Sequence, residues 1–131
     1  MPLRRRGANA VEFALVLPLM LALITGAMDI GWYFGSAHAV EHAAILGARA
    51  GALANAGEED NSDPVQVAET TAKEIAAAYP IFGSSVTASA SLLMGPPQTL
   101  KLTVTAPYEP LMGLVPLPLT RTFTSAFPVE Q

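Results

Sequence analysis

Hydrophobic and polar residues are arranged differently in the two parts of this chain, and the change falls near residue 56. In the first part no charged residue occurs from Phe13 to Met28. As an α-helix this run is about 24 Å long, and it reaches about 32 Å if it extends to Trp32-Tyr33-Phe34. A bilayer's hydrocarbon core is roughly 30 Å thick, and aromatic residues favour its edges. The pattern therefore predicts a helix that spans a membrane up to about residue 34.

An alanine-rich stretch continues this helical pattern outward to about Ala54. Small residues recur along it at a spacing of four: Gly31, Gly35, Ala39, Ala43, Gly47 and Gly51. Rows of small residues let helix backbones approach closely. We predict that this row packs against helices of a partner or against the chain's own outer domain. Pro18 removes one backbone hydrogen bond and is expected to kink or loosen the helix.

The second part begins with residues that favour the start of a helix and continues with runs in which apolar and polar residues alternate. Asp63 is a good N-cap and Pro64 suits the first helical position, so a second helix is expected to run to about Tyr79. Apolar and polar residues then alternate in three runs, which are 86–92, 100–105 and 119–127. Alternation predicts a three-stranded antiparallel sheet with one face packed on helix. The expected fold class is α+β.

The predicted organisation has four parts: residues 1–7, a long helix over 8–56, an acidic loop over 57–63 and a small α+β domain over 64–131. Within that domain, residues 107–118 form a proline-rich apolar loop. Loops are seldom so apolar unless they pack on something. This loop is expected either to cap the small core or to contact a partner subunit or the membrane surface.

Composition supports a membrane protein, because 51% of the residues are hydrophobic and 14% are charged. Three of the seven basic residues are Arg4, Arg5 and Arg6, directly before the apolar run. Such a cluster predicts that the N-terminus stays cytoplasmic and that the rest is translocated. Nothing after the helix has the basic character of a nucleic-acid surface. The absence of cysteine excludes disulfides and thiol chemistry.

One motif has the form of a catalytic signature. His38-Ala39-Val40-Glu41-His42 matches H-x-x-E-H, an inverted zinc-protease pattern. The chain has no other histidine, and the remaining residues leave little room for a substrate cleft. We interpret the motif as a solvated polar face of the helix. No metal, no cofactor and no enzymatic activity are predicted.

Glu12 is the most informative residue of the apolar segment. An acid at the start of a membrane helix costs roughly 2–3 kcal/mol or more, which makes it a functional candidate. It lies five residues after the junction Gly7-Ala8, although it could simply extend to the lipid headgroups. Three hypotheses remain for the N-terminus: a secretory signal cut near Ala37-His38-Ala39, an uncleaved signal anchor, or a leader removed after Gly7.

The run Arg6-Gly7-Ala8-Asn9-Ala10-Val11-Glu12-Phe13-Ala14-Leu15-Val16-Leu17-Pro18 resembles the opening of TadE-like proteins, the minor pseudopilins of the tight-adherence (Flp) pilus system. Residues 43–52 are similar to a small-residue stretch of that family, except that Ile45-Leu46 replaces a frequently charged pair. Residues 104–111 and 127–130 resemble its C-terminal part. The resemblance implies a pilin-like fold.

The resemblance also implies a function. A prepilin peptidase would remove a class III leader after Gly7, and Glu12 would pair with the new amine of Ala8 on an adjacent subunit. The implied partners are other pilin subunits through the N-terminal helix, an inner-membrane assembly platform and the lipid bilayer, with no nucleic acid. The implied location is the bacterial inner membrane, with the C-terminal domain outside the cytoplasm and eventually at the pilus. The alternative is an uncleaved, signal-anchored envelope protein that acts as an interaction or scaffold module.

Overall fold

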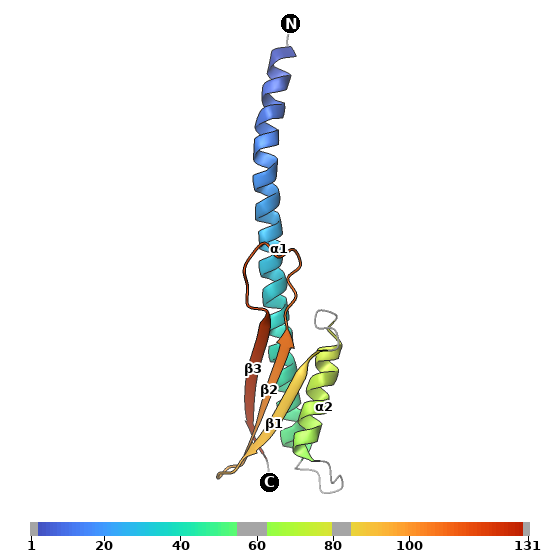
Figure 1. Cartoon of the computed structure of the whole chain (residues 1–131). Coiled ribbons are helices and arrows are strands. Elements are labelled where there is room, and N and C mark those ends of the chain that lie inside the picture. The colour runs from blue at the N-terminus through green and yellow to red at the C-terminus, as the bar shows by residue number, and fades with distance from the viewer. Residues whose placement is uncertain (1–2, 55–62, 80–84, 130–131) are drawn as a thin grey trace.

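A computed structural model describes residues 3–54, 63–79 and 85–129 of the 131-residue chain. Five elements follow one another: α1 (Leu3–Ala54), α2 (Pro64–Ala77), β1 (Thr87–Leu93), β2 (Thr99–Pro107) and β3 (Thr120–Pro128). Figure 1 shows that the C-terminal half of α1 lies beside the sheet and α2, whereas its N-terminal half projects away from them. We call the C-terminal half together with α2 and the sheet the head. The α+β class expected from the sequence is confirmed.

Some sequence predictions concern residues outside this description. The acidic residues of 57–62 belong to an undescribed segment, and so does the end of the predicted helix at 55–56. The backbone of the basic cluster Arg4, Arg5 and Arg6 and of Ala8 lies in α1, but their side chains are outside the described part.

Helix α1 runs without interruption for 52 residues. At 1.5 Å per residue it is about 78 Å long, more than twice the hydrocarbon thickness of a bilayer. It continues through Pro18, whose ring nitrogen has no hydrogen to donate to the preceding turn. The predicted outward extension to Ala54 is therefore correct.

Helix α2 begins at the predicted cap. The carboxylate of Asp63 accepts a hydrogen bond of 3.0 Å from the amide of Val65, and Pro64 occupies the first turn. The helix ends at Ala77, two residues before the predicted Tyr79. It presents an alanine face to the head, with Ala68, Ala72 and Ala76 fully buried. Alanines on this face allow α2 to lie close to α1.

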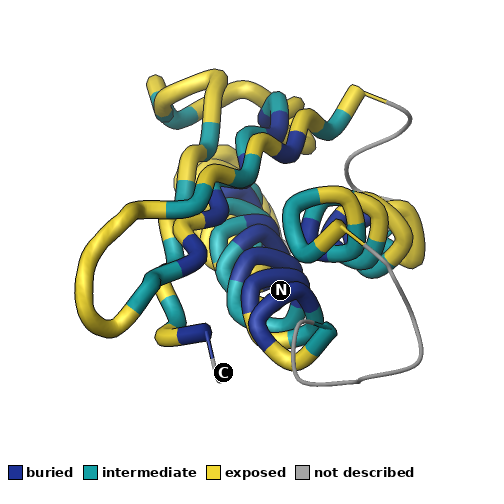
Figure 2. The backbone as a smooth tube through the Cα atoms, turned by 90° about the horizontal axis from the view of Figure 1, so that it is seen from below, coloured by how far each residue is buried: buried dark blue, intermediate teal, exposed yellow. Residues whose placement is uncertain are grey.

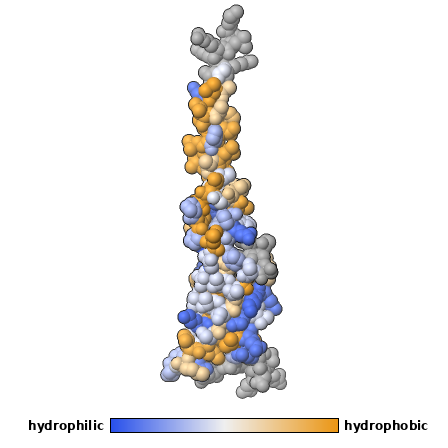
Figure 3. All heavy atoms as spheres, in the orientation of Figure 1, coloured by the Kyte–Doolittle hydropathy of each residue, from blue (hydrophilic) through white to orange (hydrophobic). Residues whose placement is uncertain are grey.

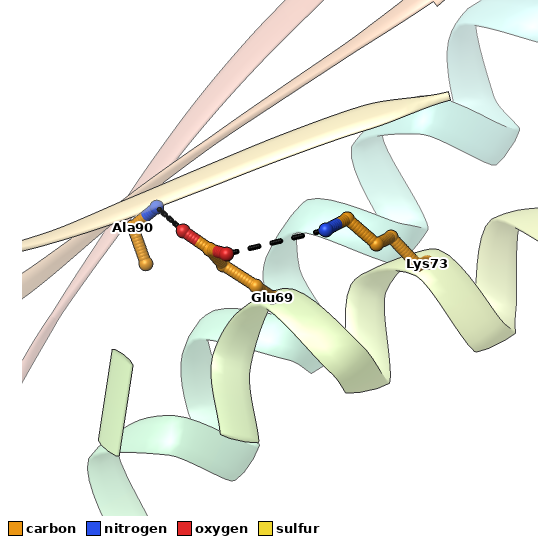
Figure 4. A network of polar contacts seen from close by, with 3 residues as sticks. All are labelled: Glu69, Lys73 and Ala90. Carbon is orange, nitrogen blue, oxygen red and sulfur yellow. Dashed lines mark hydrogen bonds and ion pairs between the residues drawn. The ribbon is translucent and has the colours of Figure 1, made fainter. Parts of the chain in front are cut away.

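A polar contact also joins α2 to the sheet, and Figure 4 shows it from close by. Glu69 accepts a hydrogen bond of 2.9 Å from the amide of Ala90 in β1. Its other carboxylate oxygen lies 4.0 Å from the ammonium nitrogen of Lys73. Because β1 pairs only with β2, Ala90 has an amide available on the free edge of the sheet. Glu69 therefore satisfies an edge-strand donor that would otherwise need water.

The three strands form one antiparallel sheet in the order β1-β2-β3, as predicted. Alternation separates its faces: the inward positions of β2 are completely buried, namely Leu100, Leu102, Val104 and Ala106. On the outer face Thr103 meets Thr124 and Thr105 meets Thr122, with hydroxyl oxygens 3.1 and 3.2 Å apart. The period-two pattern therefore assigned both faces correctly.

The core lies between the inner face of the sheet and the two helices. Figure 2, which views the molecule along α1, shows the buried residues concentrated on α1 and on the strands facing it. The α1 contribution consists mainly of small side chains, which include Ala39, Val40, Ala43, Ala44 and Ala48. The sheet supplies the larger ones, Leu100, Leu102 and Val104. Because the α1 side chains are small, they stabilise the core mainly by letting the backbones approach closely.

Candidate functional site

The row of small residues on α1 has two different environments. A Cβ atom built on Gly47 would lie 2.7 Å from Cβ of Ala72 and 2.8 Å from a methyl carbon of Leu102. A Cβ on Gly51 would lie 2.5 Å from the carbonyl oxygen of Pro64. Real side chains do not tolerate such distances, so glycine is required at both positions. The outer part of the row therefore packs on the chain's own head.

The inner part of the row is open. Gly31 and Gly35 are exposed, and nothing lies within 4 Å of a Cβ built on either. Ala39 and Ala43, by contrast, are buried in the head. The sequence left open whether partner helices or the head would contact the row. The structure assigns residues 39–51 of the row to the head and leaves open space at Gly31 and Gly35 among the described residues.

The N-terminal half of α1 is apolar and bare. Leu15 is 75% exposed and Phe13 is 65% exposed, and the other large side chains up to Met28 are similar. An 18-residue apolar window of α1 is only 6% buried, and its length and composition allow it to cross a membrane. In Figure 3 this part of the molecule carries mostly hydrophobic residues, whereas the lower part is mixed and more hydrophilic. The helix is compatible with a single-pass membrane protein.

Glu12 lies on this bare half, near its start. It is exposed, and no ion pair among the described side chains includes it. The backbone of the Gly7-Ala8 junction belongs to the same helix, and Gly7 is also exposed with open space around its Cα. Among the described side chains, Glu12 is thus an acid without a compensating charge on a largely apolar surface.

Asp29 marks the point where the head begins to cover α1. Its side chain is completely buried. One carboxylate oxygen accepts a hydrogen bond of 2.8 Å from the amide of Met112, and the other accepts one of 2.9 Å from the amide of Leu114. The hydroxyl of Tyr108 donates to the Asp29 carbonyl oxygen at 3.3 Å. The partner of the Asp29 carboxylate is therefore the connection between β2 and β3.

The conformation of this connection explains how two amides reach one carboxylate. Gly113, between Met112 and Leu114, has a φ of +71°, the left-handed region that glycine adopts without steric cost. Such a turn directs nearby amides into one concavity that holds an anion. We call residues 108–119 the Asp29-binding loop. The sequence signal for this contact was a lone acid in an apolar helix and a single glycine in an apolar loop.

Aromatic residues and one arginine surround this contact. The indole nitrogen of Trp32 donates to the Glu109 carbonyl oxygen at 3.3 Å, and the rings of Tyr33 and Tyr108 meet edge to face at 5.4 Å. The guanidinium of Arg121 lies 3.0 Å from the centre of the Tyr33 ring, a cation–π contact. Burial, with Asp29 as a lesser cause, raises the pKa of Tyr108, which keeps its hydroxyl as a donor. The loop is thus held at several points.

The apolar side chains of the loop do not cap the core. Leu111, Met112 and Leu114 are 45%, 57% and 58% exposed, although the backbone amides of Met112 and Leu114 are used by Asp29. Val115 and Leu117 are half-buried. None of these five side chains belongs to the core or packs against it, so the capping role expected for this loop has no support in the described residues.

The H-x-x-E-H motif lies on the surface of α1 beside α2. His38 approaches Glu41 at 3.5 Å within one helical turn, whereas the ring of His42 lies 3.4 Å from the hydroxyl of Tyr79. These residues line a surface groove together with Gly35 and Ile45. Among the described residues no group of three or more histidine, cysteine or acidic side chains is arranged to hold a metal ion.

Comparison with known proteins finds a similarity in the first part of the chain. The family model described as TadE-like protein matches residues 7–49, so the match begins at Gly7 and ends inside α1. Neither the curated proteins nor the solved structures give a significant match to this chain. The resemblance of residues 104–111 and 127–130 to the family lies outside the matched segment and stays a prediction. Residues 7–49 are thus similar to the TadE-like family, and this similarity suggests a pilin-like protein associated with a tight-adherence pilus.

Proposed function

We propose that this chain is a minor pilin or pseudopilin that takes part in assembly of a tight-adherence (Flp) type IV pilus. The observation that carries the proposal is the bare apolar half of α1 within a segment that matches the TadE-like family. A helix of this kind is stable in water only if something covers it. The bilayer covers it first, and other pilin or pseudopilin subunits cover it after assembly.

Processing is the first step of the proposed function. A prepilin peptidase removes residues 1–7, which contain Arg4, Arg5 and Arg6, and leaves Ala8 as the new N-terminus. The family match that starts at Gly7 supports this position of the cut. Before cleavage the arginines hold the N-terminus in the cytoplasm, and the head lies outside the inner membrane.

Glu12 is the proposed assembly residue. In the isolated chain it is exposed on an apolar surface, where membrane or protein would surround it with a low dielectric. The new α-amine of Ala8 on a neighbouring subunit supplies the compensating charge. Loss of one partner from such a buried pair typically costs about 3–5 kcal/mol. The pair therefore favours assembled subunits in the correct register.

The remaining contacts of the proposal follow from the same helix. Gly31 and Gly35 offer close approach to helices of other subunits, because nothing in the described head lies near them. The inner-membrane assembly platform is the proposed partner that moves the subunit, and adhesion is a property of the finished pilus. The chain itself acts as a structural subunit and not as an enzyme.

Cleavage is tested by determining the N-terminus of the membrane-bound protein by mass spectrometry, with and without the prepilin peptidase. We expect Ala8 as the first residue when the peptidase is present and Met1 or Pro2 when it is absent. An intact N-terminus in the presence of active peptidase contradicts the proposal and supports an uncleaved, signal-anchored envelope protein.

The role of Glu12 is tested by Glu12→Gln, with Glu41→Gln as the matched control on the same helix. Among the described residues, Glu41 forms an ion pair with His38 at the surface of the head. Glu12→Gln is expected to leave cleavage intact while incorporation into pilus fractions falls roughly a hundredfold or more. Glu41→Gln should leave both unchanged. Normal incorporation of Glu12→Gln would show that the carboxylate has no part in assembly.

A further inference from the structure

The Asp29-binding loop exposes apolar side chains that the head does not use. Leu111, Met112 and Leu114 are each close to half exposed or more, whereas the loop backbone that carries them is fixed by Asp29. A loop that is rigid in its backbone and apolar at its surface is arranged for contact with something apolar.

The position of the loop along α1 indicates which apolar surroundings its side chains contact. The membrane span predicted from the sequence runs from Phe13 to Phe34, about 32 Å of helix, and Asp29 lies five residues before its outer end. The carboxylate and the loop bound to it therefore lie near the outer edge of the membrane that α1 crosses. Figure 1 shows the connection between β2 and β3 reaching along α1 beyond the end of the sheet, toward the bare half.

The exposed loop residues are continuous with the apolar surface of α1. Met28 and Ile30, on either side of Asp29, are 49% and 43% exposed. Met112 and Leu114 are joined to the same turn of α1 through the carboxylate between them. The apolar surface of the membrane helix therefore widens at its outer end through residues from another part of the chain.

The polar groups of the loop are compatible with an interfacial position. Irregular backbone is tolerated near hydrocarbon only where its amides and carbonyls have partners. Asp29 supplies acceptors for two loop amides, and Trp32 donates to the carbonyl of Glu109. Trp32, Tyr108 and Arg121 belong to the residue types that favour the headgroup level.

We propose that the Asp29-binding loop inserts Leu111, Met112 and Leu114 into the outer headgroup–acyl boundary of the bilayer, as a second membrane contact besides α1. The contact fixes the distance of the head from the membrane and restricts its tilt, because α1 alone is free to tilt and rotate. This inference goes beyond assembly and rests only on α1 crossing a bilayer.

The chain contains no cysteine, which permits single nitroxide labels without other changes. The full-length protein carries Met112→Cys or Leu114→Cys and is reconstituted alone, at low protein content, in phosphatidylcholine–phosphatidylglycerol vesicles. The matched control is Met94→Cys. Met94 is 86% exposed in the turn between β1 and β2, at the other end of the sheet. Accessibility of each label to oxygen and to a water-soluble nickel chelate is measured by electron paramagnetic resonance.

We expect the labels at 112 and 114 to be several-fold more accessible to oxygen than to the nickel chelate, and the label at 94 to show the reverse. Equal behaviour at all three positions would overturn the proposal. Protection of 112 and 114 from both reagents would also overturn it, because a protein surface, such as a second copy, would then cover the loop. Addition of Asp29→Ala to the Met112→Cys variant should reduce the preference for oxygen. The measurement needs neither cleavage nor assembly, so its outcome is independent of the proposed pilin function.

Discussion

Two glycine pairs on α1 have the same spacing and different surroundings. Gly47 and Gly51 lie so close to α2 and the sheet that a single methyl group would overlap with its neighbours. Gly31 and Gly35, at the same spacing, have open space around them. The motif thus indicates that a close approach is permitted, and the rest of the fold decides which surface makes it.

The two halves of α1 also differ in what covers them. The outer half is the central element of a soluble core, where alanines and glycines let α2 and β2 approach. The inner half has large apolar side chains at most positions, which suit lipid or a bundle of subunits. The boundary between them is Asp29, the only completely buried acid in the described residues.

The largest expected effect comes from closing the space on the outer half. Gly51→Ala and Gly47→Ala place a methyl group 2.5–2.8 Å from backbone and side-chain atoms of α2 and β2. Overpacking of this kind typically costs about 1–3 kcal/mol, and more where backbone must move. We expect the thermal unfolding midpoint of the head in detergent to fall by roughly 10 °C or more. A change of less than a few degrees would mean that the outer half packs more loosely than the structure shows.

The boundary itself is tested by Asp29→Ala. Two amides lose a charged acceptor, and hydrogen bonds to charged groups contribute about 1.5–3 kcal/mol each. Because the loop can open without unfolding of the rest of the head, the effect should be local. We expect hydrogen exchange of the Met112 and Leu114 amides to accelerate at least roughly 30-fold, while exchange of the Ala90 amide is unaffected. The surface variant Glu41→Ala serves as the control. Unchanged protection of Met112 and Leu114 would show that the loop is held by its other contacts.

A smaller effect is expected where α2 is joined to the sheet, since this contact helps to keep α2 over Gly47 and Gly51. Glu69→Ala removes the acceptor of the Ala90 amide and should cost about 1 kcal/mol in urea unfolding. Lys73→Ala removes only a partly exposed ion pair of 4.0 Å and should stay within about 0.5 kcal/mol of the wild type. If both variants lost the same free energy of unfolding, the effect of Glu69→Ala would come from the ion pair and not from the hydrogen bond to Ala90.

The smallest effect on the head is expected at the open glycine pair, Gly31 and Gly35. Gly31→Ala and Gly35→Ala meet no atom within 4 Å, and alanine favours helix over glycine. Head stability should therefore stay the same or rise by up to about 1 kcal/mol. If partner helices use this surface, the same variants should lower incorporation into pili. A loss of head stability would remove the contrast between the two glycine pairs.

Much of the fold was predictable because its signals are local. The cap at Asp63, the alternation along β2 and the apolar run after Phe13 each act over a few residues, and each was confirmed. The contact between Asp29 and Met112 was not predictable, because it joins residues 83 apart in sequence. Its formation depends on the length of the strands between them and on the left-handed turn at Gly113.

The candidate site shows the same limit. The junction at Gly7 and the position of Glu12 are local motifs, and the family match covers both. The division of the small-residue row is not local, since all its members look alike along the sequence. Residues 39–51 of the row differ from Gly31 and Gly35 only because α2 and β2 pack against them in the folded structure.

The continuity of α1 has a mechanical consequence. The helix enters the head without a linker, and the same 52-residue rod is both membrane anchor and core element. A force applied along its inner half is therefore delivered directly to the contacts at Gly47 and Gly51 and is not absorbed by a hinge. Any rotation of the membrane segment turns the threonine-lined outer face of the sheet by the same angle. Subunits packed through their helices would thus present their heads in one defined orientation.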